Sequence, residues 1–271
     1  MEWKNLFRGL IMGISDLIPG VSGGTIAVIL GFYDRLLGAV SGFFSKDWKQ
    51  HIGFLLPLAM GMGTALVLLS RLIHYLLEHH FVPTQFFFMG LILGVIPYLV
   101  KRVDAKHNFA FRHWIILLIA AVLIASMVFV NPDRSAEPMT TLSFFSVLGL
   151  FFSGWLASMA MLLPGISGSL VLLLLGVYST AIHALSTLNL PLIAIIGSGV
   201  AVGFIVSSKS IRYLLARYPH MMYALIIGLI IGSTFVVFPG FAPDFGTMVA
   251  SIITFGSGLG LTTFFSAKNK G

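Results

Sequence analysis

The segments "IPGVSGGT" (residues 18–25) and "LPGISGSL" (residues 163–170) place the same helix-breaking residues twice inside long apolar stretches. Proline cannot continue a helix, and glycine permits positive φ angles and close approach of the backbone. Both segments therefore predict a break where an uninterrupted apolar helix would otherwise be expected. Apolar residues resume after Ser22 and Ser167, so a new helix should begin at each point.

The composition predicts an all-α polytopic membrane protein. Of 271 residues, 58% are hydrophobic and 9% charged, whereas soluble domains carry about a quarter charged residues. The chain has no cysteine, which excludes disulfides, thiol catalysis and cysteine-ligated metals. The net charge of +7 comes from short loops between apolar runs. There, Lys and Arg set topology and meet lipid headgroups, so no nucleic-acid partner is expected.

The chain divides into two similar halves. Apolar runs fall at about residues 6–33, 52–70, 84–100, 113–130, 142–178, 190–207, 221–238 and 246–266. Aligning residues 13–33 with 158–178 pairs the two motifs, and aligning 70–94 with 208–232 pairs "GLILG" with "GLIIG". We therefore expect a duplication within one integrated membrane domain, with repeats at 1–130 and 131–271 and a boundary at "NPDRSAEP" (131–138).

Loop charge predicts that the repeats are inverted, because Lys and Arg concentrate in cytoplasmic loops. The loops at 34–51, 101–112 and 207–220 are rich in Lys and Arg, whereas the equivalent loop in the other half has one such residue or none. Inversion requires an odd number of crossings per half, and three long runs per half supply it. The motif segments should then be re-entrant hairpins with arms of about 13 residues, too short to span the ~30 Å hydrocarbon core. A single broken span is the alternative. Both termini are expected in the cytoplasm.

The hairpin tips predict an anion-binding site. Irregular backbone at membrane depth is tolerated where it is buried in protein or lines a polar cavity, and the first N–H groups of a helix bind phosphate. Two tips entering from opposite faces would meet near the midplane, as in transporters with discontinuous helices. Alternatively, glycine and serine serve only close packing. The expected substrate-binding residues are Pro19, Gly20, Ser22, Gly23, Gly24, Thr25, Pro164, Gly165, Ser167, Gly168 and Ser169.

Several charged residues are candidate coupling groups or charge partners. Asp16 is the one acidic residue inside an apolar segment; it could bind H⁺ or Na⁺, pair with an arginine, or lie near the headgroups. Arg71 and Lys209 are equivalent in the two repeats, and Arg8 and Arg35 bracket the first hairpin. Each could contact phosphate or only extend toward the membrane surface. The histidines lack the spacing of a metal site, so no metal is expected.

The sequence resembles the bacterial polyprenyl-phosphate transporter family over essentially the whole chain. The resemblance rests on "GISDLIPGVSGGTIAVILGFYDRLL" and "LPGISGSLVLLLLGVYSTAI". It implies translocation of undecaprenyl phosphate from the outer to the inner leaflet of the bacterial cytoplasmic membrane, without an enzymatic step or a cofactor. A phosphate headgroup suits the helix N-termini, while the long tail remains in lipid. Asp34, before Arg35, stands where the family often has glutamate, so Asp34 is a further candidate charge partner.

Two other functions share these features. Membrane undecaprenyl diphosphate phosphatases have a similar loop, PG-x-S-R-S-G-x-T, whose arginine clamps the pyrophosphate; here Gly23 takes that place. Those enzymes also need a glutamate pair, whereas Glu2, Glu78 and Glu137 all lie outside the apolar runs. A small-anion channel or exporter would share every motif and differ only in its cargo. The coupling ion and the oligomeric state are left open.

Overall fold

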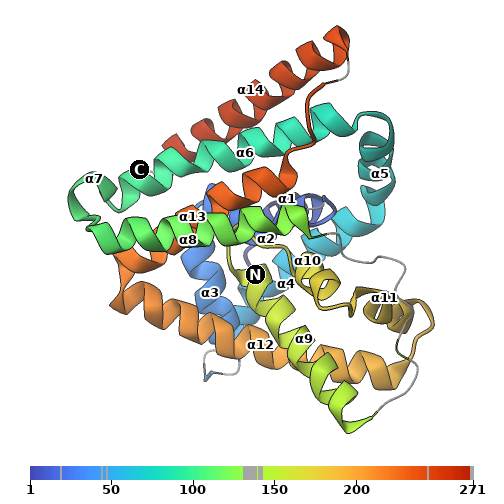
Figure 1. The fold of residues 1–271 in the computed structure, drawn as a ribbon. Helices are drawn as coiled ribbons and strands as arrows, with labels where there is room; N and C mark the ends of the chain where they lie inside the picture. Colours follow the sequence, from blue (N-terminus) through green and yellow to red (C-terminus); the bar gives the residue numbers. More distant parts are fainter. Residues whose placement is uncertain are drawn as a thin grey trace.

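The chain folds into helices joined by short turns. The computed structural model describes residues 1–268 except 19, 44, 47, 131–138, 140–142 and 243, and no strand occurs among these residues (Figure 1). Its elements are α1 (Lys4–Asp16), α2 (Gly23–Ile29), α3 (Tyr33–Ser41), α4 (Trp48–Leu68), α5 (Ser70–His79), α6 (Phe81–Arg102), α7 (Ala105–Asn108), α8 (Phe111–Ala125), η1 (Ser126–Phe129), α9 (Phe144–Leu162), α10 (Gly168–Leu174), α11 (Tyr178–Ser186), α12 (Leu190–Arg217), α13 (Pro219–Val237) and α14 (Phe245–Lys268). The expected boundary at 131–138 lies outside the described residues.

Seven helical segments among the described residues are long and apolar enough to cross a membrane: α4, α6, α8 with η1, α9, α12, α13 and α14. The chain is therefore an all-α polytopic membrane protein, as its composition predicts. The first half supplies three of these segments and the second half four, because α9 has 19 residues. Its counterpart α1 has only 13 residues. Because α9 is long enough to cross the membrane by itself, the re-entrant course of the second motif stays a prediction.

Both motifs break the helix where the sequence indicates. Gly20 and Gly165 adopt φ angles of 86° and 90°, which favour glycine. The arm after each break is shorter than expected, since α2 and α10 have seven residues each. A second turn ends each of them, at Gly31 (φ 72°) and Gly176 (φ 70°). The expectation of one arm of about 13 residues was therefore wrong, because these glycines divide each arm into two short helices.

Glycine contacts hold the longest helices together in matched pairs. In the first half, a Cβ on Gly61 of α4 would lie 2.0 Å from the carbonyl oxygen of Leu6 on α1. In the second half, a Cβ on Gly199 of α12 would lie 2.0 Å from the carbonyl oxygen of Phe151 on α9. Gly61 and Gly199 are equivalent in the repeat alignment, and so are Leu6 and Phe151. Small residues of this kind let membrane helices approach until their backbones touch.

Two further pairs join the halves. A Cβ on Gly90 of α6 would lie 2.3 Å from the carbonyl oxygen of Phe255 on α14, and a Cβ on Gly228 of α13 would lie 2.3 Å from that of Leu117 on α8. These residues are again equivalent in pairs. Figure 1 shows α14 lying along α6 at one side of the molecule and α9 crossing α12 at the other. Each half thus has one helix pair packed within it, α1 with α4 or α9 with α12. Two further pairs, α6 with α14 and α8 with α13, pack across the halves.

The cation-rich loops gather at one end of the molecule, which we call the cationic end. Asp34 at the start of α3 pairs with Arg102 at the end of α6 at 2.6 Å. Ser41 at the end of α3 lies 3.5 Å from Arg212 near the end of α12. The guanidinium of Arg102 lies 5.6 Å from the ring of Tyr223 near the start of α13. Consequently α4 begins at the cationic end, whereas its counterpart α12 ends there.

We expect Gly199→Ala to lower the stability of the folded protein. Its methyl group would clash with the Phe151 carbonyl, and overpacking typically costs about 1–3 kcal/mol. Gly197→Ala, on the same helix, is the matched control because no atom lies within 4 Å of its Cβ position. Alanine there gains helix propensity of about 1 kcal/mol. Melting temperatures in detergent should fall for Gly199→Ala only; equal values would contradict the close contact.

Candidate functional site

The two Pro-Gly motifs lie in direct contact. The backbone N–H of Gly165, in the second motif, donates a hydrogen bond to the Thr25 hydroxyl at 2.9 Å. Tyr33, at the start of α3, donates its hydroxyl to the carbonyl of Leu162 at 2.9 Å. Ser22 lies 3.4 Å from the next carbonyl, that of Leu163. Side chains around the first motif therefore bind the backbone of the second where α9 ends.

The first motif uses its polar groups internally. Ser22 is the N-cap of α2 and accepts a hydrogen bond from the N–H of Gly24 at 3.2 Å. The N–H of Gly23 donates to the carboxylate of Asp16 at 2.9 Å. All seven residues of α2 are buried. An acidic side chain at a helix N-terminus is favourable, because the free N–H groups there carry partial positive charge. In this conformation the protein's own carboxylate occupies the position predicted for an anion.

The second motif is more open. Only Gly168 is buried among the residues of α10. The hydroxyls of Ser167 and Ser169 lie 2.7 Å apart and bond to each other, and the Ser167 hydroxyl does not cap the backbone N–H groups of the first turn of α10. Pro164 is buried, and a Cβ on Gly165 would lie 2.7 Å from the α13 backbone. Pro19 lies outside the described residues. The two copies of the motif thus have different environments.

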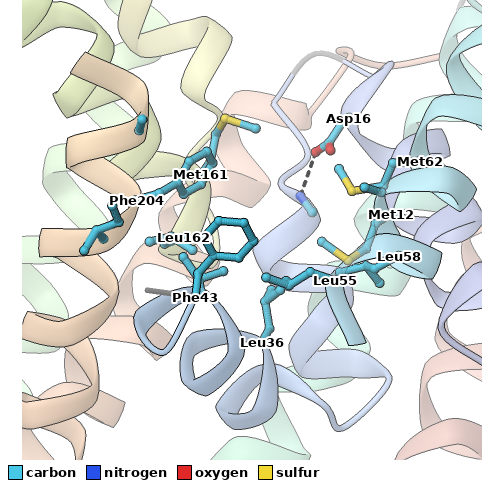
Figure 2. A pocket seen from close by; sticks show the side chains of 15 residues that line it. Met12, Asp16, Leu36, Phe43, Leu55, Leu58, Met62, Met161, Leu162 and Phe204 are labelled. Carbon is cyan, nitrogen blue, oxygen red and sulfur yellow. Dashed lines mark hydrogen bonds between the residues drawn. The ribbon is translucent and has the colours of Figure 1, made fainter. Parts of the chain in front are cut away.

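An apolar cavity of about 410 Å³ lies between the halves (Figure 2). Helices α1, α3 and α4 of the first half line it, together with α9 and α12 of the second. Asp16 and Gly23 reach it from the first motif, and Figure 2 shows Met161, Leu162 and Phe204 across from them. Asp16 is the one ionisable side chain among the described residues that line this cavity. The cavity therefore offers space for hydrocarbon, with a single carboxylate beside the first motif.

Asp16 has an amide partner rather than an arginine. Among the described residues no Lys or Arg forms an ion pair with it, and its hydrogen bond to Gly23 runs along the cavity wall. A Cβ on Gly23 would lie 3.0 Å from the Asp16 carboxylate. The equivalent of Asp16 is Met161, whose side chain likewise lies against the Cβ position of the equivalent glycine, Gly168, at 2.5 Å. The arrangement is thus shared by both motifs, whereas the charge is present in one.

The remaining charged candidates lie away from the motif tips. Arg8 lies over the ring of Phe32 at 4.9 Å, and Arg35 pairs with Glu2 at 2.5 Å. Asp34 pairs with Arg102 at the cationic end. These contacts join the N-terminal residues, α1 and α6 to the segment at residues 32–35.

The equivalent cations Arg71 and Lys209 also lie apart from the motifs. Arg71 is exposed on α5, which packs against α4 and α6. Lys209 lines a separate cavity at the cationic end. Neither residue contacts a motif tip in this conformation.

Sequence reasoning missed several residues that shape this region. Tyr33 bonds the end of α9, and its identity with Tyr178 in the repeat alignment was a usable signal. Arg102 was counted only as a loop cation, although it is the partner of Asp34. Phe204 and Met62 line the cavity, but no sequence pattern predicts this, because apolar residues that face a cavity and those that face lipid have the same composition.

Comparison with known proteins identifies the family. The sequence profile of the VCA0040-like family, described as undecaprenyl phosphate translocase-like, matches residues 12–251. The chain is 43% identical to a polyprenyl-phosphate transporter of Staphylococcus aureus over 261 residues, covering 94% of this chain and 92% of that protein. It is 34% identical to a polyprenyl-phosphate transporter of Vibrio cholerae over 245 residues, covering 86% and 76%. No solved structure matches significantly. The chain therefore belongs to the undecaprenyl phosphate translocase-like family of membrane proteins.

Proposed function

We propose that this protein moves a polyprenyl phosphate, namely undecaprenyl phosphate, across the bacterial cytoplasmic membrane from the outer to the inner leaflet. The observation that carries this proposal is the contact between two Pro-Gly motifs beside an apolar cavity between the halves. Two relatives that match over most of their length are polyprenyl-phosphate transporters. A polyprenyl phosphate combines an anionic headgroup, which the motif tips would bind, with a hydrocarbon chain, which the apolar cavity would accommodate.

We propose further that residues 1–130 and 131–271 are inverted repeats of one membrane domain. The matched glycine contacts support the duplication. The opposite directions of α4 and α12 relative to the cationic end support the inversion. Positive loops favour the cytoplasm, so we place the cationic end there. The N–H of Glu2 bonds the Gly53 carbonyl at 3.0 Å near this end, and α14 runs alongside α6 toward it. Both contacts support the proposal that the two termini lie in the cytoplasm.

In this proposal the motif tips hold the phosphate during translocation. The ligands would be the backbone N–H groups and hydroxyls of Ser22, Thr25, Ser167 and Ser169, by the anion affinity of exposed backbone N–H groups. The closed first motif and the open second motif support a one-sided conformation. In transporters built from inverted repeats, access alternates as one repeat moves against the other. Opening the first motif would require Thr25 to release Gly165.

Asp16 is the coupling group in this proposal, and its ion is a proton. The carboxylate faces the cavity and is held by the Gly23 amide. A proton needs only this one group, whereas Na⁺ requires several oxygen ligands. The other described side chains that line the cavity are apolar. Neutralising Asp16 would weaken its hold on Gly23 and free that amide for phosphate.

The geometry around Gly23 favours a carrier over a phosphatase. An arginine at this position would need a Cβ only 3.0 Å from the Asp16 carboxylate and 3.2 Å from the Met12 methyl group. A pyrophosphate clamp of the phosphatase kind therefore does not fit unless Asp16 moves. Purified protein is accordingly expected to release no inorganic phosphate from undecaprenyl diphosphate.

Translocation can be measured in vesicles with a fluorescent polyprenyl phosphate and a membrane-impermeant quencher. We expect the protein to make the outer-leaflet lipid inaccessible to the quencher, and depletion in cells lacking redundant transporters to raise surface undecaprenyl phosphate. Unchanged accessibility in both assays would contradict the proposal. Chloride or phosphate flux without lipid would instead indicate an anion channel.

The hydroxyl ligands are tested by Ser22→Ala combined with Ser167→Ala. We expect translocation to fall at least about tenfold, because a hydrogen bond to a charged group contributes about 1.5–3 kcal/mol. Ser198→Ala is the control, since that hydroxyl bonds only the Ile195 carbonyl of its own helix. Full activity of the double variant at normal expression would leave the motif a packing role.

The coupling role is tested by Asp16→Asn. The amide oxygen of asparagine can still accept from Gly23, but the side chain no longer binds a proton. Translocation by this variant should no longer respond to a pH gradient across the vesicle membrane, whereas wild-type translocation should. An unaltered response in the variant would exclude Asp16 as the coupling group.

A further inference from the structure

A basic cavity of about 620 Å³ lies at the cationic end, beside the apolar cavity. Its described lining includes Ser41, Gly42, Ser45, His51, Lys209 and Arg212. These residues come from the end of α3, the following turn, the start of α4 and the last third of α12. No carboxylate is found among the described residues that line it. None of the described residues that line it belongs to either Pro-Gly motif.

The two cavities share the same helices, and the lining changes from apolar to basic at one level. On α12, Ile205 lines the apolar cavity and Lys209 the basic one. On α4, Leu55 lines the apolar cavity and His51 the basic one. Each change takes four residues, about one helical turn of 5.4 Å. The third wall borders both cavities, because Val40 and Phe43 line the apolar cavity while Ser41, Gly42 and Ser45 line the basic one.

The positive charge of the basic cavity is not neutralised by the described protein groups. Lys209 and Arg212 form no ion pair among these residues. The hydrogen-bond partner of Arg212 is the Ser41 hydroxyl, at 3.5 Å. Arg212 also borders a cavity of about 420 Å³ that includes Asp34, but that carboxylate pairs with Arg102 at 2.6 Å. As far as the described residues show, an anion entering the cavity would meet two cations that have no carboxylate partner.

Gly42 allows His51 to reach this cavity. A Cβ on Gly42 would lie 2.3 Å from Nε2 of His51, so a larger residue would displace the imidazole. His51 is half-buried and adds a further nitrogen ligand to the lining. Guanidinium, ammonium, imidazole and hydroxyl groups together are the donors with which proteins bind phosphate.

We propose that the basic cavity binds the phosphate monoester headgroup of an isoprenoid lipid while the first isoprene units occupy the apolar cavity. This inference rests on the proposed function and adds a headgroup station at the membrane surface, separate from the motif tips. The level at which the linings of α4 and α12 change from apolar to basic matches the junction between the isoprenoid chain and the phosphate headgroup. Free inorganic phosphate shares the headgroup chemistry but not the chain.

The test measures binding to the full chain in phosphatidylcholine nanodiscs, with geranylgeranyl phosphate as the probe. We expect K209Q combined with R212Q to weaken binding at least about tenfold, as loss of two charged donors implies. R71Q is the matched control, because Arg71 is the exposed equivalent of Lys209 at the other end; it should change affinity less than about twofold. Inorganic phosphate and geranylgeraniol should each bind at least about tenfold more weakly than the probe, because each lacks one of the two contacts.

A photo-crosslinking residue locates the headgroup without altering charge. Benzophenone alanine at Tyr213, which also lines the basic cavity, should crosslink to the probe, whereas the same residue at exposed Tyr75 on α5 should not. Unchanged affinity of the double variant, or inorganic phosphate binding as tightly as the probe, would overturn this inference. The proposed function would survive that result if vesicles still translocated lipid, and would itself fall if the wild-type protein moved none.

Discussion

The structure depends on satisfying backbone groups where two helices break inside an apolar protein. An unpaired N–H or C=O costs several kcal/mol in a nonpolar medium. The two motifs solve this problem jointly, because Thr25 accepts from Gly165 and Tyr33 donates to the Leu162 carbonyl. The first break satisfies its N–H groups with Asp16 and Ser22, whereas the backbone of the second break bonds Thr25 and Tyr33 of the first half. Opening the first motif would therefore also release backbone groups of the second.

Close packing of small residues supplies the scaffold around these breaks. Lipid is as apolar as the helix surfaces, so burial gives little drive for association and contact between backbones matters more. Gly61 and Gly199 bring equivalent helices to the same separation in both halves, and Gly90 and Gly228 repeat this across the halves. The close glycine contacts therefore occur in matched pairs in the two halves of the chain. The differences between the motifs, by contrast, are concentrated at α2 and α10, where one helix is buried and the other largely open.

Much of this fold could be predicted from the sequence, because its strongest signals are local. Apolar runs give the spanning helices, and a Pro-Gly pair gives a break wherever it occurs. The second break at Gly31 and Gly176 was missed because an isolated glycine is compatible with a continuing helix. The Asp34–Arg102 pair and the cavity lining were missed for a different reason, since they join residues far apart in the sequence. The closed state of the first motif also had no signal, because Asp16 capping depends on how the turn places Gly23.

The difference between Asp16 and Met161 gives a physical basis for that asymmetry. A carboxylate can satisfy the N–H at the start of α2 from within the protein, whereas a methionine thioether is only a weak acceptor. The first motif can therefore close on its own carboxylate, whereas the Ser167 and Ser169 hydroxyls of the second motif bond each other. An anionic headgroup would compete with the Asp16 carboxylate at the first motif, whereas no carboxylate among the described residues is bonded to the second. Under the proposed function, the two motifs would bind phosphate with different strength. A proton gradient that acts on Asp16 would then alter the competition at the first motif and give translocation a preferred direction.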